Sequence, residues 1–399
     1  MKDLKSSVII ILYFLAVTAF VLTASFVISN LWSSQTKASI DEKNMSIAPG
    51  MTIMGFGKAN NLYDTVLKEL FNLKNKSELE TRLDKFGTEE RIREIVRSRA
   101  ALAEEHASKN WVKIRVKFAF WLIFLVAVFL YAGKHRMNSR LRKILLFASL
   151  SVFGVMLGAD PAPMGTVKDA IYLFAKKHVI FPPRMIALAL FLVIVLIANK
   201  YICAWGCQAG TLQDLVFRIN QDGKGKAVLG KQIRIPFAVS NSVRAVFLAI
   251  FILAAFAWGK DIIKPIDPFS IYNPVSISLA GGIFIAVLLI SSLFVYRPWC
   301  HLFCPFGLLG WVVEKASIIK ISVNYDTCIA CGKCAKSCPS TVMNAILKRE
   351  QKTIPDCFTC YSCRDVCPTK SIVFGIRKRS LPPEGHFERK AVSDKVTAA

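Results

Sequence analysis

The sequence predicts a membrane α-helical protein with about six transmembrane helices, a small cysteine-rich α+β domain near the C-terminus and a small external helical domain. Three observations support this fold class. The 399-residue chain is 54% hydrophobic with a mean hydropathy of +0.43, which is too apolar for a soluble protein of this length. Several apolar segments approach the roughly 20 residues that a helix needs to cross a bilayer. Eight cysteines crowd into residues 328–367.

The apolar segments divide the chain into five parts. The segments are 8–28, 115–133, 143–159, 184–202, 240–259 and 277–296. The predicted parts are an N-terminal transmembrane anchor (1–30), an external helical domain (31–113), transmembrane hairpin repeats (114–319), the cysteine-rich domain (320–376) and a basic tail (377–399). We interpret the first segment as an uncleaved anchor, because its apolar run exceeds that of a usual signal peptide and no clear cleavage site closes it.

The basic residues predict an orientation in the membrane. The formal net charge is +25, and Lys and Arg gather beside apolar segments, in 134–143, in 218–234 and at Arg297. Such clusters mark cytoplasmic connections rather than a nucleic-acid surface. Threading six helices with a cytoplasmic N-terminus places all of them on one side. We therefore expect a multi-pass protein of the cytoplasmic (inner) membrane whose cysteine-rich domain lies in the cytoplasm, with no nucleic acid as partner.

The predicted external domain shows helical periodicity without a cofactor motif. Leu67 and Leu70 continue one apolar stripe, and Thr88 can cap a helix that carries Ile92. Two interpretations stay open here. The domain is either a packed helical unit without chemistry or a docking platform for an extracytoplasmic redox partner.

The cysteine-rich domain contains the pattern CxxCxxCxxxCP twice. In this pattern three thiolates hold one iron–sulfur cluster and the fourth holds its neighbour. A zinc site needs only four thiolates and accounts for neither the third spacing nor the proline. A cytoplasmic location disfavours disulfides. Strand-like segments 321–324 and 371–374 bracket the two blocks. The domain therefore carries electrons on iron–sulfur clusters.

The two blocks resemble bacterial two-cluster ferredoxins, and this resemblance implies a ligand set for each [4Fe-4S] cluster. The first set is Cys328, Cys331, Cys334 and Cys367. The second set is Cys357, Cys360, Cys363 and Cys338.

The hairpin region contains a second repeated motif, CxxxCxxGxL, which follows the fourth and sixth apolar segments. An Asp-Pro precedes each copy, at Asp160 and Asp267. The motif cysteines are Cys203, Cys207, Cys300 and Cys304. Parallel repeats should bring the two pairs together at the cytoplasmic face. Three uses stay open for them, namely a third iron–sulfur cluster, redox-active dithiols or Cu(I) binding. Lys200 and Arg297 nearby should lower the thiol pKa values.

Other cofactors lack their signatures. The chain has no CxxCH haem-attachment motif and no glycine-rich dinucleotide fingerprint, and none of its five histidines lies in the middle of an apolar segment. Clusters on one side of a membrane cannot carry electrons across about 30 Å of hydrocarbon. A diffusing quinone would complete such a path.

The order of parts over residues 115–375 resembles the NapH and NosR-type membrane ferredoxins, with the CcoG-type proteins as more distant relatives. Their membrane motif reads CxxxCP, which Cys300 to Pro305 matches, whereas Gln208 replaces the proline in the first copy. The chain also lacks the TGAT-like flavin-attachment sequence of the NosR type.

These observations lead to two functional hypotheses. The first is a quinol-linked electron-transfer subunit, such as a component of a quinol dehydrogenase, with membrane lipid, quinone and redox subunits on either side of the membrane as partners. The alternative is a copper-handling or cofactor-assembly protein that acts through the four CxxxC cysteines.

Overall fold

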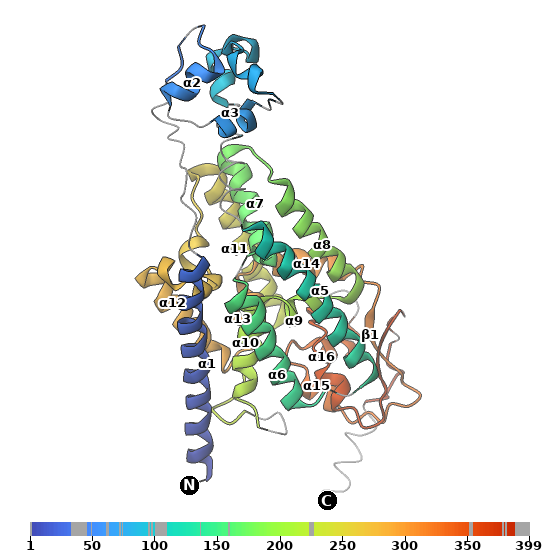
Figure 1. Cartoon of the computed structure of the whole chain (residues 1–399). Helices are drawn as coiled ribbons and strands as arrows, with labels where there is room; N and C mark the ends of the chain where they lie inside the picture. The colour runs from blue at the N-terminus through green and yellow to red at the C-terminus, as the bar shows by residue number, and fades with distance from the viewer. Residues whose placement is uncertain are drawn as a thin grey trace, which may run out of the picture.

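The computed structural model describes residues 2–387 apart from short gaps. The gaps are 33–45, 49, 61–63, 72, 74, 95, 97–98, 100–109, 136, 159, 223–226, 351–353, 377–378 and 380. Figure 1 shows a body of helices with a small helical domain at one end and the cysteine-rich domain at the other. Most of the predicted basic tail lies outside the described residues.

Within the described residues, three helices are long and apolar enough to cross a membrane. They are α1 (Lys2–Trp32), α5 (Trp111–Lys134) and α11 (Phe237–Trp258). Shorter apolar helices are α8 (Pro182–Ala198), α12 (Leu279–Ser292) and α14 (Pro305–Glu314). The predicted segment 143–159 instead forms α6 (Ser139–Ser149) and a π-helical stretch, η3 (Leu150–Met156). The threading of six helices through a membrane stays a prediction.

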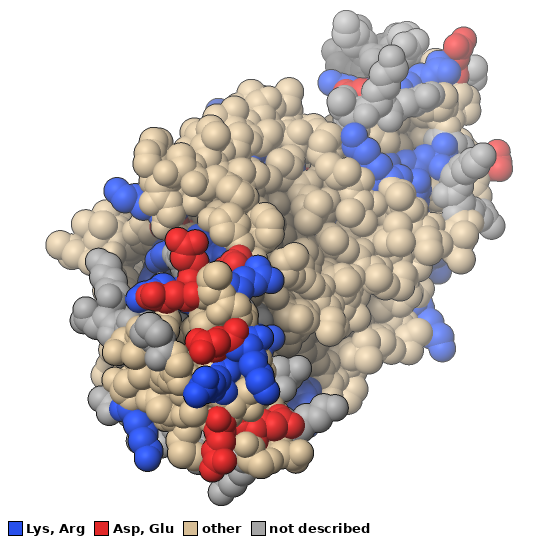
Figure 2. All heavy atoms as spheres, turned by 90° about the horizontal axis from the view of Figure 1, so that it is seen from above, with Lys and Arg blue, Asp and Glu red and all other residues tan. Residues whose placement is uncertain are grey.

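The exterior of the helical body is apolar. Large hydrophobic side chains point outward on each long helix, for example Leu12 (59% exposed), Ile123 (66%) and Leu253 (63%). Figure 2 shows a broad surface with few charged side chains between two groups of them. Soluble monomers rarely expose an apolar area of this kind. The surface therefore suits contact with lipid.

Both CxxxC motifs lie where a short helix is followed directly by a second helix, and the two junctions have the same form. The short helix α9 (Tyr201–Trp205) carries Cys203, and Cys207 is the extended N-cap residue of α10 (Gln208–Ile219). Likewise, α13 (Pro298–Leu302) carries Cys300, and Cys304 is the N-cap residue of α14. The local fold repeats as the sequence repeat predicts.

The remaining elements of the helical body are short. They are α7 (Pro163–Lys177), η4 (Lys264–Ile266), η5 (Pro268–Tyr272) and η6 (Pro274–Ser276).

The cysteine-rich domain is a small α+β unit. Strands β1 (Lys320–Val323) and β2 (Ile372–Gly375) pair antiparallel, with Ile321 opposite Phe374. The helices between them are α15 (Lys333–Ser337), α16 (Val342–Leu347) and α17 (Ser362–Asp365). The predicted strands at both ends of the cysteine blocks are confirmed to within one residue.

The small domain at the opposite end has its own hydrophobic core. Its elements are α2 (Ile53–Ala59), α3 (Asp64–Phe71), η1 (Lys76–Glu80), η2 (Leu83–Phe86) and the helical residues 89–94. Phe56, Leu67, Leu70 and Ile92 are among its buried residues. Its predicted helical character is confirmed.

Candidate metal centres

The four CxxxC cysteines meet inside the helical body. Each is buried, at 7–8% exposure, and all belong to one core cluster. Cys300 lies close enough to interact electrostatically with Cys207 and Cys304, and Cys203 with all three others. The predicted meeting of the two pairs is therefore confirmed. Among the described residues, no group of three or more His, Cys, Asp or Glu side chains is placed to hold a metal ion.

A glycine follows each pair at the same spacing and allows a close backbone approach. A Cβ atom on Gly210 would lie 2.5 Å from the carbonyl oxygen of Cys203. One on Gly307 would lie 2.7 Å from the carbonyl oxygen of Cys300. Real Cβ atoms essentially never come within 3.0 Å of another heavy atom. The glycine of CxxxCxxGxL is therefore needed to pack the following helix against the first cysteine.

A buried cation precedes each pair by three residues and reaches into the other repeat. Lys200 Nζ donates to the carbonyl oxygen of Gly307 (2.5 Å), and Arg297 Nη1 donates to that of Cys203 (2.6 Å). Both residues have 0% exposure. The two repeats therefore hold each other reciprocally at the backbone beside their cysteines.

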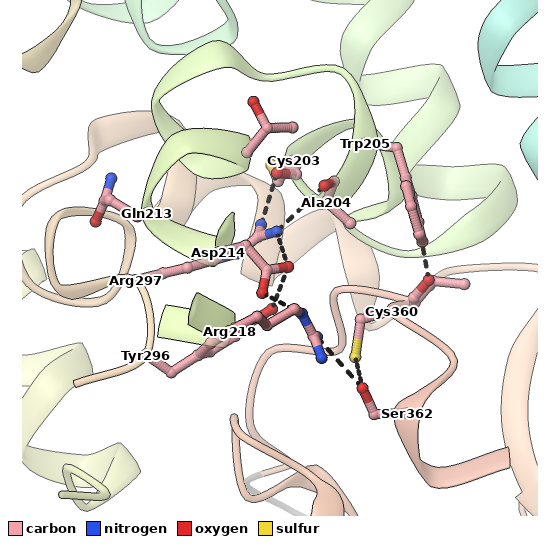
Figure 3. Close-up of polar contacts among 12 residues, drawn as sticks. Cys203, Ala204, Trp205, Gln213, Asp214, Arg218, Tyr296, Arg297, Cys360 and Ser362 are labelled. Carbon is pink, nitrogen blue, oxygen red and sulfur yellow. Dashed lines mark hydrogen bonds and ion pairs between the residues drawn. The ribbon is translucent and has the colours of Figure 1, made fainter. Parts of the chain in front are cut away.

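A chain of polar contacts continues from Arg297 to the cysteine-rich domain (Figure 3). Asp214 accepts hydrogen bonds from Arg297 Nη2 and Arg218 Nε, both at 2.7 Å. Burial alone would raise the pKa of Asp214, but the two guanidinium groups hold it below its usual range. Arg218 Nη2 also donates to Ser362 Oγ (3.3 Å), which lies 3.4 Å from the sulfur of Cys360. Charged side chains thus connect the first CxxxC pair with the second cysteine block.

A second buried carboxylate, Asp356, directly precedes Cys357. It pairs with Lys200 Nζ (2.7 Å) and Arg244 Nη1 (2.8 Å), and all three side chains have 0% exposure. Arg244 also donates to the carbonyl oxygen of Cys300 (3.4 Å). Burial would raise the pKa of Asp356, yet the two cations hold it at about 2. The carboxylate therefore stays ionised, pairs with both cations and offsets one of their two positive charges.

The loop 357–360 of the second cysteine block packs into the helical body. Phe358 is 3% exposed and belongs to the same core as the four CxxxC cysteines. Its ring centroid lies 4.8 Å from Arg297 Cζ and 5.7 Å from Lys200 Nζ. Lys200 N donates to the carbonyl oxygen of Cys357 (3.1 Å). The second block thus makes direct contact with the residues around the CxxxC pairs.

The eight cysteines of the C-terminal domain form two groups. Cys334 interacts electrostatically with Cys328, Cys331 and Cys367, and Cys363 interacts foremost with Cys338, Cys360 and Cys357. These groups match the two ligand sets that the ferredoxin resemblance implies. Their part in binding clusters stays a prediction.

The nearby cations do not make the buried CxxxC thiols acidic. Burial raises the pKa values of Cys203 and Cys300 well above the usual value, and Lys200 and Arg297 offset only part of that rise. The two cations lower the thiol pKa values as we expected, but burial has the larger effect, so the net pKa values are raised. The loss of hydration outweighs the cations when a thiol is fully buried.

Sequence reasoning missed several residues that build this region. Asp214, Arg244 and Phe358 belong to no recognised motif, and only the tertiary fold brings them to the cysteines. The two cations beside the cysteines, in contrast, were recognised from the sequence. Lys200 and Arg297 occupy equivalent positions in the repeat, three residues before the first cysteine of each pair.

Comparison with protein families finds iron–sulfur domains in both regions. Residues 320–368 match a family described as a 4Fe-4S dicluster domain. A second family, described as a 4Fe-4S binding domain, matches twice, at 179–236 and 277–323. Each of the two matches contains one CxxxC pair. The same family therefore describes both copies of the repeat.

Several known proteins are similar over about half of the chain. "Putative electron transport protein YccM" of Escherichia coli is 34% identical over 49% of this chain and 56% of its own length. "Methylamine utilization ferredoxin-type protein MauN" of Paracoccus denitrificans is 28% identical over 48% of this chain and 65% of its own length. An uncharacterised protein of Methanocaldococcus jannaschii is 23% identical over 48% of this chain and 71% of its own length.

The chain thus spans little more than half the length of YccM. No solved structure matches. The chain therefore contains ferredoxin-type 4Fe-4S domains in both regions and is similar to iron–sulfur electron-transport proteins.

Proposed function

We propose that this protein is a membrane-bound electron carrier between quinone and a redox partner, with three [4Fe-4S] clusters. Two clusters would occupy the C-terminal domain, and the third would be held by Cys203, Cys207, Cys300 and Cys304. The observation that carries the proposal is the packing of Phe358, from the second cysteine block, against Arg297 and Lys200, the cations that precede the two CxxxC pairs. This contact joins the second cysteine block directly to the region around the CxxxC pairs.

The residue types around the CxxxC pairs suit an iron–sulfur cluster, although the four sulfurs are not placed around one ion position in this structure. Four thiolates are the usual ligands of such a cluster. Gly210 and Gly307 let the backbone close tightly behind the cysteines, and Lys200 and Arg297 supply buried positive charge beside them. Disulfide exchange requires access by a second thiol. The burial of all four sulfurs therefore favours the cluster over redox dithiols.

The protein would keep the two cysteine regions at a fixed separation. A bound cluster supplies one-electron transfer. The chain from Arg297 through Asp214 and Arg218 to Ser362 holds the second block in place, as Asp356 does from the other side. Phe358 fills the interior between the regions and excludes water. This rigid, dry contact supports a relay from the CxxxC pairs to the cluster of Cys357, Cys360, Cys363 and Cys338.

A pocket between α5, α7 and α8 supports the quinone part of the proposal. Trp111, Phe118 and Phe181 provide aromatic walls, while Asp160 and Arg184 are polar. The enclosed part of the pocket has a volume of about 60 Å³. Together with the solvent-filled opening, its empty volume is about 470 Å³. Flat apolar walls with a few polar groups suit a quinone ring. The ring would enter through the open mouth as the side chains move apart.

Aromatic side chains lead from this pocket to both CxxxC pairs. The ring of Phe118 contacts Trp121 (5.8 Å between centroids), whose Nε1 donates to the carbonyl oxygen of Gly206, directly before Cys207. Phe118 also stacks on Phe191 (5.9 Å), which meets Phe306 (6.4 Å), two residues after Cys304. The pocket and the cysteines are therefore joined by continuous packing.

The proposal includes an orientation. The N-terminus and the ferredoxin-type domain would lie in the cytoplasm, on the side marked by the basic segments 134–143 and 218–234. The quinone pocket and the small helical domain would then lie toward the opposite face, where a redox subunit has access to that domain.

Iron content tests the third cluster. We expect about twelve irons and twelve acid-labile sulfides per chain in anaerobically purified wild type. The variant with Cys203, Cys207, Cys300 and Cys304 all replaced by serine should hold about eight and keep the electron paramagnetic resonance signals of the ferredoxin-type domain.

An iron content of about eight in both proteins would contradict the third cluster. Tight Cu(I) binding by wild type that the quadruple variant lacks would then favour the copper-handling alternative.

Filling the aromatic pocket should block quinone without removing clusters. Gly165 lines the pocket, and a Cβ atom there meets only ordinary contacts. Gly165→Leu should slow cluster reduction by a short-chain quinol, and oxidation by the quinone, by about tenfold or more. Gly282→Leu, on α12 and not lining this pocket, is the matched control. Equal rates in the two variants at equal iron content would sink the assignment of this pocket.

A further inference from the structure

A large cavity lies on the seam between the helical body and the ferredoxin-type domain. Its volume is about 600 Å³. Residues within 137–142, 217–221 and 232–234 form one wall, and residues within 333–339 and 362–366 form the other. No cysteine is among the described residues that line it. The cavity is therefore not the space that a cluster would fill.

The walls of the cavity are strongly basic. One acidic side chain, Asp365, lies among the described lining residues, and it pairs with Arg142. The lining cations are Arg142, Arg218, Arg234, Lys333 and Lys336. Arg218 is paired with Asp214, which does not line the cavity. The other three lining cations, Arg234, Lys333 and Lys336, have no carboxylate partner among the described lining residues. An anion inside would be attracted from both sides.

Two nitrogen donors of the lining residues are buried beneath the cavity surface and lack a hydrogen-bond partner. They are Nε of Arg142, whose side chain is 7% exposed, and Nε2 of Gln232. Buried polar groups in proteins nearly always have a partner, and an unpaired donor is costly. Since neither atom is accessible to a water-sized group, neither faces the cavity, and an anion would be attracted by the positive lining itself.

We propose that this cavity binds a phosphate-bearing anion. Guanidinium groups match phosphate oxygens with paired, charge-assisted hydrogen bonds. Two sources share this chemistry, the headgroup of an anionic phospholipid and a free phosphate compound. Basic pockets beside transmembrane helices are known sites for phospholipid headgroups. Phe217, Ile233 and Val366 on the same walls would contact the acyl chains of such a lipid.

Binding by defined variants tests this proposal. Purified full-length protein with its clusters would be titrated with radiolabelled inorganic phosphate and, separately, with short-chain phosphatidic acid. We expect Arg142→Gln to weaken binding of whichever of the two ligands wild type binds, by about tenfold or more, because it removes a charged donor. Since Arg142 also holds Asp365, Arg234→Gln serves as a second variant that leaves that ion pair in place, with the same expected loss. Arg234 itself donates to the carbonyl oxygens of Ala335 and Lys336, so this variant also removes two hydrogen bonds across the seam.

Arg140→Gln is the matched control. It removes the same charge from the same helix, but Arg140 is exposed and does not line the cavity. Its affinity should equal that of wild type. Equal weakening by Arg140→Gln, or unchanged affinity in Arg234→Gln, would overturn the proposal, because binding would then reflect only general surface charge.

The two ligands distinguish the sources. Saturation by inorganic phosphate supports a free phosphate compound. Binding of phosphatidic acid but not of phosphatidylcholine or inorganic phosphate supports a lipid headgroup. Failure of both phosphate-bearing ligands to bind wild type would refute the site.

Discussion

Replacing Asp356 by asparagine is expected to destabilise the protein by about 3–5 kcal/mol. The carboxylate balances Lys200 at 2.7 Å and Arg244 at 2.8 Å in a site where none of the three side chains is exposed. Without its charge, two buried cations lose their counterion and cannot be hydrated. The effect should reach the function as well, because Lys200 and Arg244 hydrogen-bond to the carbonyl oxygens of Gly307 and Cys300.

Thermal unfolding of the cluster-loaded protein in detergent measures this effect. The midpoint of Asp356→Asn should fall by about 4–6 °C, with early loss of visible cluster absorbance. Glu384→Gln is the control, since it removes one negative charge from an exposed ion pair with Arg349 in the C-terminal region. Surface pairs contribute at most about 1 kcal/mol. An Asp356→Asn midpoint equal to that of the control would show that the buried pairs do not hold the domains together.

The cysteine spacings were the most predictive feature of the sequence. The cysteine ligands of a cluster lie close together in the sequence, because one short loop must bring several thiols to the same place. For this reason the two C-terminal blocks, their flanking strands and the repeated CxxxC junctions could be read without a structure. The repeat also predicted that Cys203 and Cys300 approach each other, and in the structure they lie close enough to interact electrostatically.

The charged residues around the cysteines could not be predicted in this way. Asp214 and Asp356 are separated by 142 positions in the chain, yet both neutralise cations beside the same four thiols. Hydropathy and periodicity treat a charged side chain as a surface residue. Only the packing of the two repeats against the C-terminal domain buries these charges and brings them into ion pairs.

The third apolar segment shows another limit of hydropathy. We predicted it over 143–159, but α6 begins at Ser139, where the side chain of Asn138 accepts a hydrogen bond from Leu141 N. This N-cap and the ion pair of Arg142 with Asp365 keep a polar first turn in the helix. A sliding-window hydropathy average leaves such a polar turn out of the helix, because it takes no account of the carboxylate that pairs with the buried arginine.

Replacing Gly210 by alanine should remove the third cluster while leaving the other two. The new methyl group would lie 2.5 Å from the carbonyl oxygen of Cys203, a backbone atom that also accepts a hydrogen bond from Arg297. Relief of this collision must move α10 away from α9, and overpacking of this kind typically costs about 1–3 kcal/mol. Because Cys203 and Cys207 lie on the two sides of the junction, their separation would change. Iron should fall from about twelve toward about eight per chain.

Gly282→Ala provides the control for the same substitution. Gly282 lies in α12, and a Cβ atom there meets only one side-chain carbon, of Ile277, at 3.6 Å. Alanine should be tolerated at that position, with iron content and quinol-driven reduction as in wild type. If Gly210→Ala kept both properties as well, the tight junction would not be what positions the CxxxC cysteines. If it lost quinol-driven reduction but kept its iron, the junction would instead govern the path from quinone to the cysteines.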